Sequence, residues 1–143
     1  MRIATTDAPS TAALDAVDAG LCRHNDDEPA LAHVRRLCVF ATADDGRVVG
    51  GAVGRSWGEC CELQQLWVSE ALRGQGLARR LVGDFEREAR RRGCRLAYLD
   101  TFSFQAPALY EKLGYRAVLV TRGFTGGIEK YTLHKQLLPG DGP

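Results

Sequence analysis

The sequence has almost no net charge and no long apolar run. Nineteen Lys and Arg residues offset eighteen Asp and Glu residues, which leaves a formal charge of +1. The chain therefore lacks the positive field that attracts nucleic acid or an anionic membrane surface. No apolar run approaches the roughly 20 residues of a membrane-spanning helix, and the first residues lack the apolar core of a secretion signal. We expect no nucleic-acid partner, no membrane partner and a cytoplasmic location.

Cysteine and histidine form no recognisable site pattern. The five cysteines, at positions 22, 38, 60, 61 and 94, are an odd number, and their spacings match no zinc motif. The three histidines are scattered, and none lies beside a serine or cysteine in a nucleophile motif. We therefore expect no metal and no histidine-activated nucleophile.

What the sequence does contain is enough apolar material for one core. The chain has 143 residues, of which 45% are hydrophobic, and this is an ordinary composition for a globular protein of one domain. Repeats, low-complexity tracts and linkers are absent from the sequence. We predict a single domain over residues 1–138 and a frayed, Pro- and Gly-rich tail over 139–143.

The first half is predicted to hold helices followed by a three-stranded meander. A capping serine or threonine at positions 10 and 11 precedes apolar residues at helical spacing, Leu14, Val17 and Leu21. The Asp45-Gly46 pair marks a hairpin turn. The predicted elements are a strand at 2–5, a helix from 10 or 11, a second helix at 30–36, and strands at 37–43, 48–57 and 62–68.

The second half predicts a crossover. Leu77, Leu81, Val82, Phe85 and Ala89 form one apolar stripe of a helix over 77–92, and a strand over 96–101 follows it. A strand, a helix and a strand in this order place the two strands parallel. A short helix at 107–113 and two final strands, at 115–120 and 130–137, complete the prediction.

The segment Arg73-Gly74-Gln75-Gly76-Leu77-Ala78 joins the strand that ends at Val68 to the long helix. The first turn of a helix has N–H groups with no internal partner and carries partial positive charge. Glycines allow the backbone to approach an anion closely. The segment therefore predicts a pyrophosphate site.

Two common phosphate motifs do not fit this segment. The dinucleotide fingerprint G-x-G-x-x-G requires a third glycine, and Arg79 occupies that position. The P-loop requires Gly-Lys followed by Ser or Thr, which is absent here.

The segment resembles the signature of the GNAT superfamily of acyl-CoA-dependent N-acyltransferases, in which Arg or Gln is followed by x-x-Gly-x-Gly/Ala. A second block, Leu109-Tyr110-Glu111-Lys112-Leu113-Gly114-Tyr115, resembles a later helix of that family. The resemblance covers nearly the whole chain. It implies an α+β (mixed α/β) fold with a central, mostly antiparallel sheet of six to seven strands. The fourth and fifth strands form a parallel, splayed pair, and about four helices flank the sheet.

The resemblance also implies a site for acetyl-CoA as cosubstrate. Backbone amides of the glycine segment hold the pyrophosphate, and the strand before it pairs with the pantetheine arm as an added strand would. Room for that arm requires a splay, which usually needs a β-bulge. The implied binding residues are Leu66, Trp67, Val68, Arg73, Gly74, Gln75, Gly76, Leu77, Ala78, Arg79, Ser103 and Tyr110. Ser103 stands where many members have Asn, and its reach is shorter.

Two side chains are implied in catalysis. Glu62 stands where some members carry a glutamate that accepts the proton of the amine; Glu59 and a route through bulk water are alternatives. Tyr110 is the family's usual proton donor to the departing thiolate, because a phenol with a pKa of about 10 is protonated at neutral pH.

The acceptor follows less directly from the sequence. We expect direct attack by a primary amine, in a small molecule or an amino acid, within a ternary complex. The alternatives are a protein lysine or N-terminus as acceptor, and a non-catalytic acyl-CoA sensor. Members of the family often form homodimers, so a homodimer is possible here. The sequence does not decide whether acyl groups other than acetyl are transferred.

Overall fold

The computed structural model describes residues 1–138 and divides the chain into two units, Met1–His33 and the part from Val34 onward. In the first unit, α1 (Thr11–Asn25) begins after Ser10, whose Oγ accepts a hydrogen bond from the Ala13 N–H at 3.2 Å. This confirms the predicted helix and its cap. The strand predicted at 2–5 is wrong, because residues 1–10 have no regular structure and no neighbouring strand in their own unit. The expected tail at 139–143 lies outside the described residues, and the single domain stays a prediction.

The helix predicted at 30–36 is also wrong. Pro29–His33 forms only a short 3-10 helix, η1, and Arg35 begins a strand. Arg35 and Arg36 pair with Ser56 and Arg55 of the next strand. The apolar residues of this segment have helical spacing, but strand pairing outweighs that local preference.

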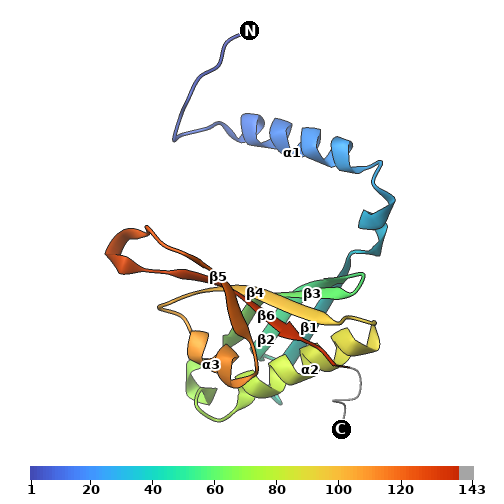
Figure 1. Cartoon of the computed structure of the whole chain (residues 1–143), viewed down its shortest axis with the longest axis vertical. Helices are drawn as coiled ribbons and strands as arrows, with labels where there is room; N and C mark the ends of the chain where they lie inside the picture. Colours follow the sequence, from blue (N-terminus) through green and yellow to red (C-terminus); the bar gives the residue numbers. More distant parts are fainter. Residues whose placement is uncertain (139–143) are drawn as a thin grey trace. The chain divides into compact units, whose positions relative to one another are not determined.

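The second unit is built on a six-stranded sheet in the order β1-β2-β3-β4-β6-β5 (Figure 1). Every neighbouring pair is antiparallel except β3 and β4, which are parallel. The fourth and fifth strands of the prediction are therefore β3 and β4 here, because the first predicted strand is absent. The strands are β1 (Arg35–Thr42), β2 (Val48–Trp57), β3 (Cys60–Val68), β4 (Leu96–Phe102), β5 (Arg116–Thr121) and β6 (Lys130–Gln136).

The crossover helix α2 (Leu77–Arg91) packs on one face of the sheet, below it in Figure 1. Its predicted apolar stripe is the buried one, since Leu81, Val82, Phe85 and Ala89 are all buried in the core. The helix ends before Gly93, whose φ of 89° is the left-handed conformation that favours glycine. The short helix α3 (Pro107–Lys112) has its proline at the start, as expected.

The parallel pairing of β3 with β4 is only three residues long and ends at Glu62↔Tyr98. Beyond that point β3 continues beside β2, whereas β4 continues beside β6 through Phe102. The register of β2 with β3 shifts at the same place, so that Gln64 is an extra residue opposite the Val53–Gly54 step. This β-bulge bends β3 away from β4, and it confirms the splay that the resemblance implies.

The bulge requires a glycine on the facing strand. A Cβ at Gly54 would lie 1.9 Å from the carbonyl oxygen of Glu62 and 3.0 Å from Cζ of Phe85. Gly54 therefore allows β2 and β3 to approach closely where β3 bends, and it fixes the position of the Glu62 backbone.

Candidate active site

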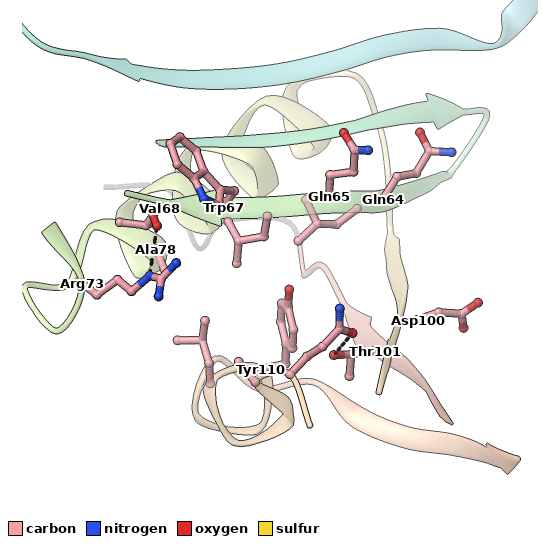
Figure 2. Close-up of a pocket in the computed structure, with 14 residues that line it drawn as sticks. Gln64, Gln65, Trp67, Val68, Arg73, Ala78, Asp100, Thr101 and Tyr110 are labelled. Carbon is pink, nitrogen blue, oxygen red and sulfur yellow. Dashed lines mark hydrogen bonds between the residues drawn. The ribbon is translucent and has the colours of Figure 1, made fainter. Parts of the chain in front are cut away.

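The splay between β3 and β4 opens a cavity of about 680 Å³ (Figure 2). One wall is β3, and the other is formed by β4, the segment after it and α3. Arg73 and Ala78 line the end of the cavity nearest α2. The lining residues are Leu63, Gln64, Gln65, Leu66, Trp67, Val68, Arg73, Ala78, Asp100, Thr101, Gln105, Ala106, Leu109 and Tyr110. Six of the predicted site residues are among them: Leu66, Trp67, Val68, Arg73, Ala78 and Tyr110.

The β3 wall offers a free strand edge. Because β4 does not pair with β3 beyond Glu62, the backbone groups of residues 63–68 that face β4 have no strand partner there. An extended chain of amides can pair with such an edge by β-augmentation. The Val68 carbonyl is an exception, since the Arg73 Nε donates to it at 3.1 Å.

The glycine segment forms the turn that leads into α2. A short 3-10 helix, η2 (Glu70–Leu72), precedes it, and Gly76 is the N-cap residue of α2. Gly74 and Gly76 have φ angles of 73° and 79°, and no atom lies within 4 Å of the Cβ position at either one. The space in front of both glycines is therefore open, and the free N–H groups of the first turn of α2 lie beside it.

The side chains of the glycine segment differ in their contacts. Gln75 folds back and donates from Nε2 to the Ala71 carbonyl at 3.2 Å. The Arg79 side chain is exposed and forms no ion pair within residues 1–138. Gly74, Gln75, Gly76, Leu77 and Arg79 do not line the cavity, so their binding role stays a prediction that rests on backbone amides beyond its end.

Tyr110 projects from α3 into the cavity toward β3 (Figure 2). Its residue is 9% exposed, and its ring packs edge-on against Tyr115 with 5.9 Å between the centroids. Burial raises the pKa of the Tyr110 hydroxyl above its usual value. The hydroxyl therefore carries its proton at neutral pH and is able to donate it.

Ser103 does not line the cavity, whereas its near neighbour Gln105 does. The Ser103 hydroxyl accepts the Glu129 N–H at 3.1 Å, and this hydrogen bond ties the end of β4 to the segment before β6. Gln105 lines the cavity instead, and its Oε1 accepts the Phe102 N–H at 2.8 Å. That bond leaves the amide group of Gln105 held at the cavity wall, where a polar side chain can meet the cosubstrate.

Asp100 is a lining residue that the sequence analysis missed. Its Oδ1 accepts one hydrogen bond from the Thr132 hydroxyl at 2.6 Å, and the Nζ of Lys130 lies 3.2 Å from its Oδ2. The Thr132 hydroxyl, followed by Lys130, holds the pKa of the Asp100 carboxyl below its usual value. No motif marks this position; only the splay, which turns β4 toward the cavity, identifies it.

Glu62 lies at the apex of the splay but lines a second, smaller cavity of about 280 Å³. Its Oε2 accepts a hydrogen bond from the Arg55 Nε at 2.8 Å and another from the Tyr98 hydroxyl at 3.4 Å. The Oε1 atom has no hydrogen-bond partner in residues 1–138. One carboxylate oxygen is thus fixed by the protein, and the other is open to a ligand.

Within residues 1–138, no three His, Cys, Asp or Glu side chains gather in a way that could hold a metal ion. In the same part of the chain, no helix is both long and apolar enough to cross a membrane.

Comparisons with known proteins agree on one family. Residues 8–115 match the model of the acetyltransferase (GNAT) family. The chain is 42% identical to acetyltransferase Atu2258 of Agrobacterium fabrum, and the match covers 59% of this chain and 61% of that protein. It is 33% identical to blasticidin-S acetyltransferase of Streptomyces morookaense, over 76% of this chain and 89% of that protein. A protein of Agrobacterium tumefaciens solved as a candidate acetyltransferase is 32% identical and has a TM-score of 0.80, over 95% of this chain and 99% of that one.

Proposed function

Because this chain belongs to the GNAT acetyltransferase family, we propose that it transfers the acetyl group of acetyl-CoA to a primary amine by direct attack. Acetyl-CoA supplies the thioester, whose C–S bond breaks as the C–N bond forms. The ammonium loses one proton to a base before attack, and its nitrogen loses a second to solvent as the amide forms; the departing sulfur gains one proton from an acid, which solvent then restores. The observation that carries the proposal is the splayed cavity, which is lined by the free edge of β3 and by Tyr110 and which ends at Arg73 and Ala78, beside the N-terminus of α2.

The residues present fit the cosubstrate. The free edge of β3 at Leu66–Val68 would take the pantetheine arm, and the open space before Gly74 and Gly76 would take the diphosphate. Backbone amides supply most of these contacts, which explains why side chains such as Gln75 can turn elsewhere. In this proposal the exposed Arg79 meets the 3′-phosphate of the cosubstrate.

Three groups carry the chemistry in this proposal. Glu62 takes the proton of the ammonium through its open Oε1, directly or through a water molecule. A backbone N–H near Val68 donates to the acetyl oxygen as that oxygen gains negative charge. Tyr110 then donates its proton to the sulfur. A lysine-like amine has a pKa of about 10.4, so removing its proton at pH 7 costs about 4.6 kcal/mol, and this cost makes a nearby base valuable.

The acceptor in this proposal is a small molecule. Two observations support a small acceptor. The cavity at Glu62 is small, about 280 Å³, and one relative is named blasticidin-S acetyltransferase. A protein lysine or N-terminus is the alternative acceptor. Homodimerisation and a cytoplasmic location stay predictions.

The activity is tested by thiol release from acetyl-CoA on addition of a panel of primary amines. We expect release with at least one amine of low mass and none without an acceptor. A thermal shift with acetyl-CoA alone measures binding separately. Stabilisation by acetyl-CoA without thiol release from any amine would overturn the enzyme and support an acyl-CoA sensor.

Substituting Glu62→Gln is expected to lower kcat by about 100-fold or more, because glutamine keeps the shape and the Arg55 contact but accepts no proton. The rate of the variant should also rise more steeply with pH, since the free-amine fraction then depends on bulk solvent. Steady-state rates between pH 6.5 and 9 measure both effects.

Glu59→Gln is the matched control, because Glu59 is exposed, lies 3.9 Å from Arg95 and does not line the cavity at Glu62. Its rate should equal that of the unmodified chain. A threefold or smaller effect of Glu62→Gln, or an equal loss with Glu59→Gln, would remove Glu62 from the role of base.

A further inference from the structure

The second cavity is built around an ion pair and two aromatic rings. Its lining residues are Arg55, Trp57, Gly58, Cys60, Glu62 and Tyr98. They come from the ends of β2, β3 and β4 that adjoin the short parallel joint. In β2 and β3 the residues of this cavity alternate with buried ones such as Ser56 and Cys61, so they point away from the core under α2.

Both partners of the Arg55–Glu62 ion pair have hydrogen-bonding groups left for a ligand. A guanidinium group carries five N–H donors, and the Nε of Arg55 makes the one contact with an acidic side chain found in residues 1–138. The Arg55 side chain is 46% exposed and that of Glu62 is 24% exposed, so a ligand can reach both. With the free Oε1 of Glu62, the cavity presents an open cation beside an open anion.

We propose that this cavity selects acceptors that are amino carboxylates, with Arg55 binding the carboxylate and Glu62 binding the ammonium. The inference rests on the proposed function and names its substrate class. An amino acid is a zwitterion whose two charges are as close together as those of Arg55 and Glu62. It therefore satisfies both side chains without adding net charge to the cavity.

A simple amine fits the same cavity less well. Its ammonium pairs with Glu62 but brings a second positive charge beside Arg55, and like charges at short range repel. A carboxylate on the acceptor removes this repulsion and forms a charge-assisted pair with the planar guanidinium. Arg55 thus becomes a specificity-determining residue.

The remaining walls favour an apolar side chain on the acceptor. Trp57, on the same strand as Arg55, and Tyr98, on β4, both line the cavity, and Cys60 adds a further weakly polar surface. The Tyr98 ring also packs edge-on against His134, with 6.3 Å between the centroids, which fixes its orientation. Burial, followed by the charge of Glu62, raises the pKa of the Tyr98 hydroxyl, so it stays a donor to Glu62.

Matched acceptor pairs test the proposal. Phenylalanine and phenethylamine, or leucine and 3-methylbutylamine, differ only in the carboxylate. We measure kcat/KM for both members with the unmodified chain and with Arg55→Gln, and compare the ratio of acid to amine between the two proteins. This comparison cancels the different basicities of the two amines. The ratio is expected to fall by about 10- to 100-fold in the variant, as for the loss of a charged hydrogen bond.

Two further variants serve as controls for the Arg55→Gln measurement. Arg47→Gln removes an arginine that pairs with Asp45 in the exposed β1–β2 turn, and it should leave the ratio unchanged. Arg55→Lys keeps the charge without the planar fork and should restore part of the ratio. Thermal unfolding of each variant confirms that it folds.

A binding measurement makes the test independent of turnover. Calorimetric titration of phenylalanine into the protein with non-reactive CoA present should give a Kd about 10-fold or more weaker for Arg55→Gln than for the unmodified chain. Phenethylamine should show no such difference.

The outcomes separate the two proposals. Thiol release with an unchanged acid-to-amine ratio in Arg55→Gln would overturn the amino-carboxylate inference and leave the acetyltransferase standing. An equal loss of rate for acid and amine would do the same, because Arg55 would then only position Glu62. Absence of thiol release with every amine would overturn the proposed function, while the titration would still decide whether the cavity binds amino carboxylates.

Discussion

Tyr110→Phe is expected to lower kcat by about 100- to 10,000-fold, the range typical for loss of a positioned general acid, while the Kd for acetyl-CoA changes little. Phenylalanine keeps the ring that packs against Tyr115 and removes only the hydroxyl. That hydroxyl forms no hydrogen bond within residues 1–138, so the fold does not depend on it. Single-turnover rates and equilibrium binding of acetyl-CoA measure the two effects separately.

Tyr115→Phe is the matched control for this substitution. Tyr115 is 1% exposed, and its ring lies next to that of Tyr110, but it does not line the cavity. Its loss should leave kcat unchanged. Equal losses in rate and in acetyl-CoA affinity for Tyr110→Phe would exclude the donor role.

The pH profile gives a second check on Tyr110. Because burial raises the pKa of its hydroxyl, the acid form persists through the whole neutral range. Loss of the acid form should therefore reduce kcat only above pH 10, the usual value for a phenol. A fall in kcat centred near pH 8 would point to another acid.

Gly54→Ala is expected to cause the largest loss of stability of any glycine-to-alanine substitution within residues 1–138. The new Cβ would lie 1.9 Å from the carbonyl oxygen of Glu62, and a backbone atom cannot move aside as a flexible side chain does. Overpacking of a core typically costs about 1 to 3 kcal/mol, and we expect a value at or above the top of that range. For a chain of this size, about 3 kcal/mol corresponds to a fall in Tm of about 10 °C.

Gly83→Ala provides the comparison. Gly83 lies within α2, and nothing lies within 4 Å of its Cβ position. Alanine is the better helix former by about 0.5 to 1 kcal/mol, so this variant should gain stability. Thermal unfolding of both variants measures the difference, and a Tm for Gly54→Ala within about 2 °C of the unmodified chain would refute the steric argument.

Much of the second unit could be predicted because local pattern and tertiary structure agree there. The apolar stripe of 77–92 gives α2, and the Asp45-Gly46 turn gives the β1–β2 hairpin. The glycine segment and the block around Tyr110 are short motifs whose residues lie close in sequence, so the resemblance could assign both to one cosubstrate site.

What the sequence could not show depends on contacts between distant residues. The bulge at Gln64 exists because β2 lacks a side chain at Gly54, and nothing near Gln64 in the sequence signals it. Asp100 reaches the cavity only because β4 departs from β3. Ser103 stands at the position where many family members have Asn, but its hydroxyl accepts a hydrogen bond from the N–H of Glu129, 26 residues away.

The three-residue joint between β3 and β4 also bears on how the sheet assembles. One half, β1-β2-β3, is continuous in sequence from Arg35 to Val68, and the other, β4-β6-β5, is continuous from Leu96 to Gln136. The hairpins β1–β2, β2–β3 and β5–β6 join chain neighbours, and such contacts are the fast ones in folding, whereas β4 pairs on both sides with strands that are distant in sequence, β3 and β6. We therefore expect the hairpins to form early and β4 to enter the sheet last, so that the cleft between β3 and β4 is the final part of the second unit to take shape.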